Sequence, residues 1–179
     1  LFYFRFFIFS LVIFFFLESK ILNFKYLILS LAIPIFVLFI DSSLQFFTGS
    51  NIFGWETPSS GRISSLFGKE LKMGSYISRI FPILILSLYV YFNQKKFQLS
   101  FIIVIFVSFY LIVISGERTA LFNIILFLII FILANKQYRL LITLITLISL
   151  FLSTFIILKN KNLSNRAILT IEQTGIGTD

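Results

Sequence analysis

Residues 101–133 read FIIVIFVSFYLIV, ISGERTA and LFNIILFLIIFIL, so two apolar runs flank one short polar turn. Extended to about residues 99–115 and 119–134, the runs approach the roughly 20 mostly apolar residues with which an α-helix crosses a membrane. Neither run alternates polar with apolar residues, as the strand of a transmembrane β-barrel would. The stretch therefore predicts two membrane-spanning helices joined by the turn Gly116, Glu117 and Arg118, called here the GER turn.

The composition of the chain supports this class of protein. Of its 179 residues, 59% are hydrophobic, 12% are charged and 26 are Phe. A soluble domain of this size could not bury so much apolar surface. Cysteine and histidine are absent from the sequence, which excludes disulfides, metal sites with thiolate or imidazole ligands, and Cys or His nucleophiles within these residues. We expect an integral membrane protein with no metal and no cofactor.

Six apolar runs predict an all-α, polytopic bundle of about six transmembrane helices. They cover roughly residues 1–17, 24–40, 75–92, 99–115, 119–134 and 140–158. The expected organisation is two helices in 1–40, a periplasmic loop in 41–74, four helices in 75–158 and the start of a large periplasmic loop in 159–179. Because the chain begins inside an apolar run and ends in polar sequence, we expect it to be a fragment of a longer bundle.

The basic residues predict the orientation of the bundle. Every second connection carries a pair of cations: Lys20 with Lys25, Lys95 with Lys96, and Lys136 with Arg139. The positive-inside rule makes these connections cytoplasmic, so the residues 41–74, the GER turn and the tail face outward. The formal charge of +8 is spread as ones and twos between apolar runs, which indicates a topology signal rather than nucleic-acid binding.

The GER turn is a candidate anion site. If a helix begins near Thr119, the turn lies at its N-terminus, where free backbone N–H groups and the helix dipole favour anions. Arg118 would cost about 0.3–1 kcal/mol against that dipole. Its partner could be Glu117 or another carboxylate, or an anionic ligand such as phosphate, whose geometry fits a guanidinium fork. A capped turn with an arginine that reaches toward water is the alternative.

The outward connection in residues 41–74 supplies further polar candidates. A cationic rim just above the membrane is predicted from Arg62, Lys69, Lys72 and Arg79, and hydroxyl groups are added by Ser64, Ser65 and Tyr76. Such a rim could equally bind anionic lipid headgroups. Trp55, the only tryptophan, is either an anchor at the membrane interface or a platform on which a sugar stacks.

Three segments together resemble the O-antigen ligase/polymerase family of bacterial envelope glycan enzymes. They are DSSLQFFTGSNIFGW (41–55), GRISSLFGKELKMGSYISRIFP (61–82) and SGERTALFNIILF (115–127), and the resemblance covers roughly residues 35–175. It implies glycosyl transfer from an undecaprenyl-diphosphate-linked glycan on the periplasmic face of the bacterial inner (cytoplasmic) membrane, without a nucleotide sugar or a required metal.

The resemblance also implies roles for individual residues. Arg62 and Arg118 are implied to bind the diphosphate and to act in catalysis. The expected substrate-binding residues are Lys69, Tyr76, Arg79, Glu117 and Arg166. Ligases of the family typically place an important histidine in a large periplasmic loop, and this sequence has none. Either the chain ends before that residue or it is a polymerase that works differently, and a polymerase is the favoured expectation.

The expected partners are an undecaprenyl-diphosphate-linked oligosaccharide and membrane lipids, with a chain-length regulator and a flippase as further candidates, and no nucleic acid. Three alternatives remain open: a ligase that transfers glycan to the lipid A core, a transporter or flippase of lipid-linked oligosaccharide, and a structural membrane subunit. A transporter would place ionisable residues at mid-span. A structural subunit would tolerate Arg118→Lys, to which a bidentate phosphate site is sensitive.

Overall fold

The computed structural model describes residues 23–58 and 61–159, together with residues 8, 11–12, 15–16 and 18–19. Most of the predicted span 1–17 lies outside the described residues. So does the predicted segment 159–179 after its first residue, including Arg166.

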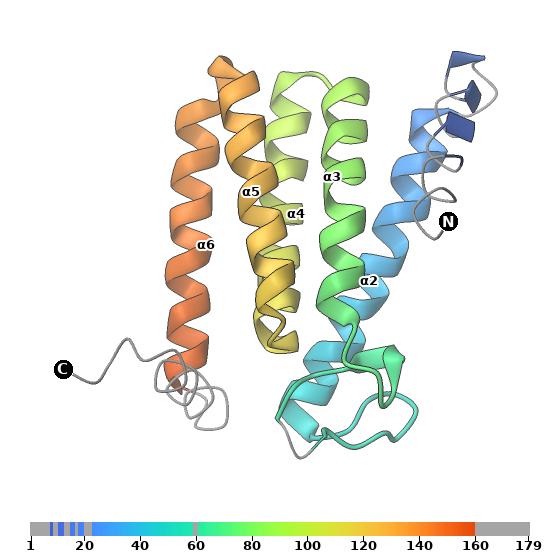
Figure 1. The fold of residues 1–179 in the computed structure, drawn as a ribbon, viewed down its shortest axis with the longest axis vertical. Coiled ribbons are helices and arrows are strands. Elements are labelled where there is room, and N and C mark those ends of the chain that lie inside the picture. Colours follow the sequence, from blue (N-terminus) through green and yellow to red (C-terminus); the bar gives the residue numbers. More distant parts are fainter. Residues whose placement is uncertain are drawn as a thin grey trace.

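The described part of the chain is an all-α bundle, as predicted. It contains α2 (Phe24–Thr48), α3 (Met73–Tyr91), α4 (Gln94–Ser115), α5 (Arg118–Ala134) and α6 (Arg139–Lys159), with the 3-10 turns η1 (Ser65–Phe67) and η2 (Lys136–Tyr138). Figure 1 shows the long helices running up and down beside one another. The described residues form no β-strand, and Ser50 and Glu56 make one isolated bridge. Pro34 and Pro82 lie inside α2 and α3, where membrane helices tolerate proline.

The predicted count of six spans is not confirmed. Within the described residues, α2, α3 and α4 are each long and apolar enough to cross a membrane. A fourth candidate is α5 taken with residues 136–152, a pair of helices bent by 112° at a short break. With 17 residues, α5 is at the lower limit of about 17–25 residues for a spanning helix. The structure therefore supports three spans, or four with the bent pair.

The interior of the bundle is built from aromatic and branched side chains around α3. This helix packs against α2, α4 and α5, while α4 also packs against α6. The largest fully buried side chains include Phe81, Phe97, Phe101 and Phe109. Other large apolar side chains, among them Phe122 on α5, are exposed on the outside of the bundle. Helices that are apolar inside and outside suit a hydrocarbon environment, in which the outer face contacts lipid.

Helix α2 extends beyond the span predicted from the sequence. The outward loop was expected to begin at residue 41, but α2 continues to Thr48 and ends at Gly49, whose φ is 86°. Asp41, Ser42 and Gln45 lie on the buried side of these added turns. The expectation was wrong because polar residues were taken to end the helix, whereas here they face other protein groups that hydrogen-bond to them.

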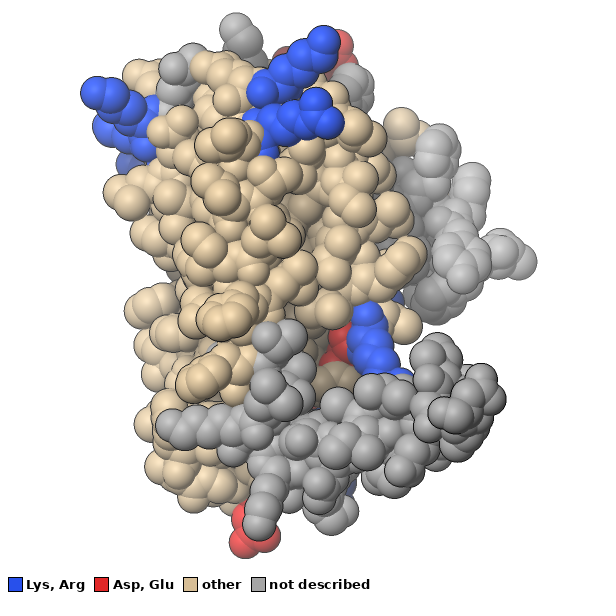
Figure 2. All heavy atoms as spheres, turned by 90° about the vertical axis from the view of Figure 1, so that its left-hand side faces the viewer, with Lys and Arg blue, Asp and Glu red and all other residues tan. Residues whose placement is uncertain are grey.

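The two ends of the bundle carry different connections. The α3–α4 and α5–α6 connections, which hold Lys95, Lys96, Lys136 and Arg139, lie at one end, and the α2–α3 connection and the GER turn lie at the other (Figure 1). In Figure 2, a wide belt without charged side chains separates Lys and Arg groups at the upper end from charged groups near the lower end. This is the alternation predicted from the sequence, and the side of the membrane that each end faces stays a prediction.

Candidate functional site

The connection between α2 and α3, residues 49–72 and called here the α2–α3 loop, begins with a tight turn over the end of α2. The Asn51 N–H donates to the Trp55 carbonyl at 3.0 Å, and the Thr57 N–H donates to the Gly49 carbonyl at 2.8 Å. The Asn51 side chain closes the turn from within, because its Oδ1 accepts from the N–H groups of Phe53 (3.0 Å) and Trp55 (2.8 Å). These bonds hold the backbone on both sides of the turn in one arrangement.

Ser65 joins this turn to α2 through a buried polar network. Its N–H donates to Gln45 Oε1 at 2.7 Å, and its hydroxyl donates to Asp41 Oδ2 at 2.5 Å. Its carbonyl accepts from Asn51 Nδ2 at 3.1 Å, and Asp41 Oδ1 accepts from the Ile52 N–H at 2.9 Å. Asp41, Gln45 and Ser65 are each 0% exposed. Ser65 has a φ of 51°, a conformation that costs about 1–3 kcal/mol and persists only where several contacts enforce it.

Arg62 lies on the GER turn. Its Nε–H donates to the Ser115 carbonyl at 2.8 Å, and the neighbouring Ile63 N–H donates to the Ile114 carbonyl at 3.1 Å. Gly116, with a φ of 66°, allows this approach, since a Cβ atom there would lie 3.3 Å from Arg62 Cγ. The structure thus brings Arg62 to the C-terminal end of α4. Glu117 and Arg118 follow this end in the sequence.

Glu117 caps the N-terminus of a neighbouring helix, α3. Its Oε1 accepts from the Gly74 N–H at 2.9 Å, and its Oε2 accepts from the Ser75 N–H at 2.9 Å and from the Ser75 hydroxyl. Gly74 and Ser75 lie in the first turn of α3, whose N-cap residue, Lys72, makes no capping side-chain bond. A carboxylate suits free N–H groups and the positive end of the dipole. The Glu117 carboxylate therefore holds the first turn of α3 in this structure, and its expected contact with substrate stays a prediction.

The remaining predicted residues of this end are placed as follows. Arg118 is the first residue of α5, as expected, and its side chain is exposed. Arg79 is exposed on α3, one turn beyond Ser75, and the Tyr76 ring packs against the Phe67 ring with centroids 5.6 Å apart. Lys69 is exposed on the wall of a pocket. The segment that contains Arg166 lies outside the described residues.

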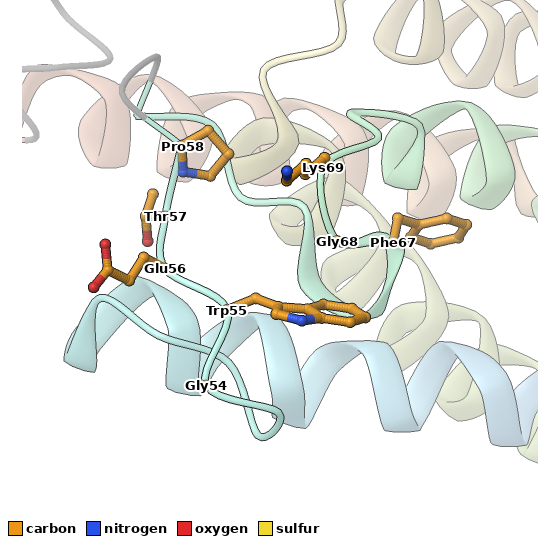
Figure 3. Close-up of a pocket in the computed structure, with 8 residues that line it drawn as sticks. All are labelled: Gly54, Trp55, Glu56, Thr57, Pro58, Phe67, Gly68 and Lys69. Atoms are coloured by element: carbon orange, nitrogen blue, oxygen red, sulfur yellow. The ribbon is translucent and has the colours of Figure 1, made fainter.

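The pocket of about 830 Å³ opens within the α2–α3 loop and is called here the Trp55 pocket. Two segments of the loop line it: Gly54, Trp55, Glu56, Thr57, Pro58, Phe67, Gly68 and Lys69. In Figure 3, the Lys69 side chain extends toward Pro58 across the space beside the Trp55 ring, and Glu56 points away from the α2–α3 loop's second segment. The pocket combines an aromatic surface with one carboxylate, one ammonium group and one hydroxyl.

Sequence reasoning missed the polar network beneath this pocket. Asp41 and Gln45 are four residues apart and so share one helix face, a spacing that would have indicated a polar face if the helix had been continued through them. Asn51 carried no comparable signal, because its role depends on a turn that only the folded loop defines.

The site offers hydrogen-bond donors and cations rather than metal ligands. Among the described residues, no group of three or more His, Cys, Asp or Glu side chains could hold a metal ion. Arg62, Arg118 and the N-terminus of α5 are brought to one end of the bundle by the GER turn, an arrangement suited to a phosphate or diphosphate group.

Comparison of this chain with protein-family models, with curated proteins and with solved structures finds no match. The geometry described above and the sequence patterns are therefore the basis for a functional conclusion.

Proposed function

We propose that this chain is a polymerase-type glycosyltransferase of bacterial surface polysaccharide, of the O-antigen kind, that uses an undecaprenyl-diphosphate-linked glycan on the periplasmic face of the inner membrane. The observation that supports the proposal is the contact of Arg62 with Ser115, the last residue of α4, which directly precedes the GER turn. Arginines from two separate connections thereby lie at the same end of the bundle.

In the proposed reaction, an acceptor hydroxyl attacks the anomeric carbon of the donor sugar. The bond from that carbon to the diphosphate oxygen breaks, the lipid diphosphate leaves, and the hydroxyl proton passes to a base. Negative charge grows on the leaving oxygen, where Arg62 and Arg118 stabilise it. One charge-assisted hydrogen bond contributes about 1.5–3 kcal/mol, so two bidentate arginines would raise the rate by a few powers of ten. Asp41 and Glu117 both accept hydrogen bonds from backbone N–H groups, so we assign neither as the base.

A ligase that transfers glycan to the lipid A core is the alternative within the resembled family, whose ligases typically use a histidine in the large periplasmic loop expected to start at residue 159. A transporter of lipid-linked oligosaccharide is a less suitable function for these helices. Residues 97–116 and 119–135 contain no Asp, Glu, Lys or Arg, and a transport path through α4 and α5 would call for ionisable groups at mid-span.

The proposal is tested with Arg118→Ala and Arg118→Lys variants in the producing bacterium, with the native copy deleted. We expect both variants to insert at the normal level and to lose long glycan chains, because an ammonium group cannot replace a bidentate guanidinium. Lys95→Ala, at the other end of the bundle, should keep the full glycan ladder. A full ladder from Arg118→Ala would contradict the proposal. Movement of lipid-linked sugar across liposomes by the purified chain would favour the transporter.

A further inference from the structure

The Trp55 pocket has the size and the wall of a small-molecule site. Its volume of about 830 Å³ falls within the roughly 300–1,000 Å³ of typical ligand pockets. Trp55 is 46% exposed, so much of its indole remains open to a ligand. Gly68 permits the close packing of the two walls, because a Cβ atom there would lie 3.2 Å from Trp55 Cζ3.

The polar groups around the indole match the surface of a sugar. A pyranose ring has an apolar C–H face that packs on an aromatic ring, and an edge of hydroxyl groups that need donors and acceptors. The Lys69 ammonium group is a donor, and its exposed side chain extends across the space beside the indole (Figure 3). The Glu56 carboxylate lies at the edge of the pocket and points away from that space.

The backbone that carries these side chains is held in place before any ligand binds. Asn51 Oδ1 accepts from the Trp55 N–H at 2.8 Å, and the Trp55 carbonyl accepts from the Asn51 N–H at 3.0 Å. The Thr57 hydroxyl donates to the Gly49 carbonyl at 3.0 Å, which leaves its lone pairs to accept a bond. Such preorganisation lowers the entropic cost of binding.

We infer that the Trp55 pocket is a saccharide subsite in which a pyranose stacks on Trp55 and hydrogen-bonds to Lys69. The inference deepens and presupposes the proposed function, because it names the place where the glycan, rather than the lipid diphosphate, is held. An anchor that dips into lipid is the competing role for Trp55.

The only tryptophan of the chain makes the test direct, since its fluorescence reports on this pocket alone. The full chain, purified in lipid nanodiscs, is titrated with two probes, chitotriose and maltotriose, and quenched with aqueous acrylamide or with brominated phosphatidylcholine. We expect a saturable change of emission and protection from acrylamide with at least one sugar. No response to either sugar, or quenching by brominated lipid with no sugar effect, overturns the inference.

Matched variants link the response to the pocket. Lys69→Ala should raise the Kd for the sugar about tenfold, as for the loss of one charge-assisted hydrogen bond. Lys72→Ala changes the same residue type in the same loop outside the pocket, and should leave the Kd within about twofold. Equal effects of the two variants would overturn the inference.

The outcome is distinguishable from failure of the proposed function. A sugar-dependent signal from Trp55 together with a full glycan ladder from Arg118→Ala would support the saccharide subsite and contradict the polymerase function. Loss of the ladder with no signal from Trp55 would support the polymerase function and contradict the subsite.

Discussion

The Nε–H of Arg62 donates a 2.8 Å hydrogen bond to the backbone carbonyl of Ser115, which is 53 residues away in the sequence. This bond joins the α2–α3 loop to the end of α4. Two residues further on, Glu117 holds the first turn of α3. The GER turn connects α4 to α5 and also contacts α3 and the α2–α3 loop. Changes in this turn should therefore affect both stability and activity.

The Glu117 cap predicts a loss of stability in Glu117→Gln. An amide presents one acceptor oxygen and an NH₂ group that faces a backbone donor, so one N–H of α3 would lose its partner. We expect a free energy of unfolding lower by about 1–2 kcal/mol, measured as a lower Tm of the purified chain in detergent. Glu70→Gln is the matched control, since Glu70 is exposed and its ion pair with Lys72 contributes little. Equal Tm values for the two variants would disprove the cap.

The close packing at Gly74 predicts that an alanine destabilises α3, against the usual helix propensity. A Cβ atom at Gly74 would lie 2.5 Å from Ser115 Oγ and 3.0 Å from Glu117 Cβ. Gly74→Ala should therefore lower the free energy of unfolding by about 1–3 kcal/mol through overpacking, although Ala favours helices by about 0.5–1 kcal/mol over Gly.

Ser115→Ala provides the test of this cause. Adding it to Gly74→Ala removes the nearest atom, so the double variant should recover part of the lost Tm. A stabilised Gly74→Ala chain, or a double variant with purely additive losses, would show that the crowding is not the cause.

The buried network predicts opposite behaviour for two adjacent serines. The Ser65 hydroxyl is bonded to Asp41, whereas the Ser64 hydroxyl is buried without a hydrogen-bond partner among the described residues. Ser65→Ala should cost about 1.5–3 kcal/mol, because it removes a hydrogen bond to a buried carboxylate. Ser64→Ala should be neutral or stabilising. Thermal unfolding of the two variants measures the difference, and equal losses would contradict the assigned network.

The helical bundle itself was largely predictable from the sequence. Apolar runs longer than a buried core helix requires indicate membrane helices, and their ends follow from charged or glycine-containing turns such as the GER turn. The number of spans was less predictable, because α5 has only 17 residues and is joined to α6 by a sharp bend at Lys136–Tyr138. Composition alone does not report the angle between two helices.

Of the candidate site, the sequence predicted only which charged residues lie at the same end of the bundle. Arg62 and the GER turn were assigned to one end from the alternation of connections, and the structure places them in contact. The capping of α3 by Glu117 could not be foreseen, since it joins residues more than 40 positions apart. Ser65 was expected to add a hydroxyl group to the outward rim, but it is buried and bonded to Asp41, Gln45 and Asn51, an arrangement that only the folded loop defines.

The orientation of the bundle predicts which end an external reagent reaches. The native sequence contains no cysteine, so Lys69→Cys and Lys95→Cys are each single-cysteine chains. We expect a membrane-impermeant maleimide to label Lys69→Cys on intact spheroplasts, and to label Lys95→Cys only after permeabilisation, as the positive-inside rule requires. The reverse pattern would place the GER turn in the cytoplasm and contradict a periplasmic site.

The central claim, that Arg62 and Arg118 bind one diphosphate together, is tested most directly by calorimetric titration of the purified chain with farnesyl diphosphate. Arg62→Lys and Arg118→Lys should each weaken binding about tenfold or more, since both lose the guanidinium fork. The double variant should lose less than the product of the two, because neighbouring groups on one ligand are coupled. Lys95→Arg, at the opposite end, should bind as the native chain does. An unchanged Kd in either arginine variant would contradict the claim.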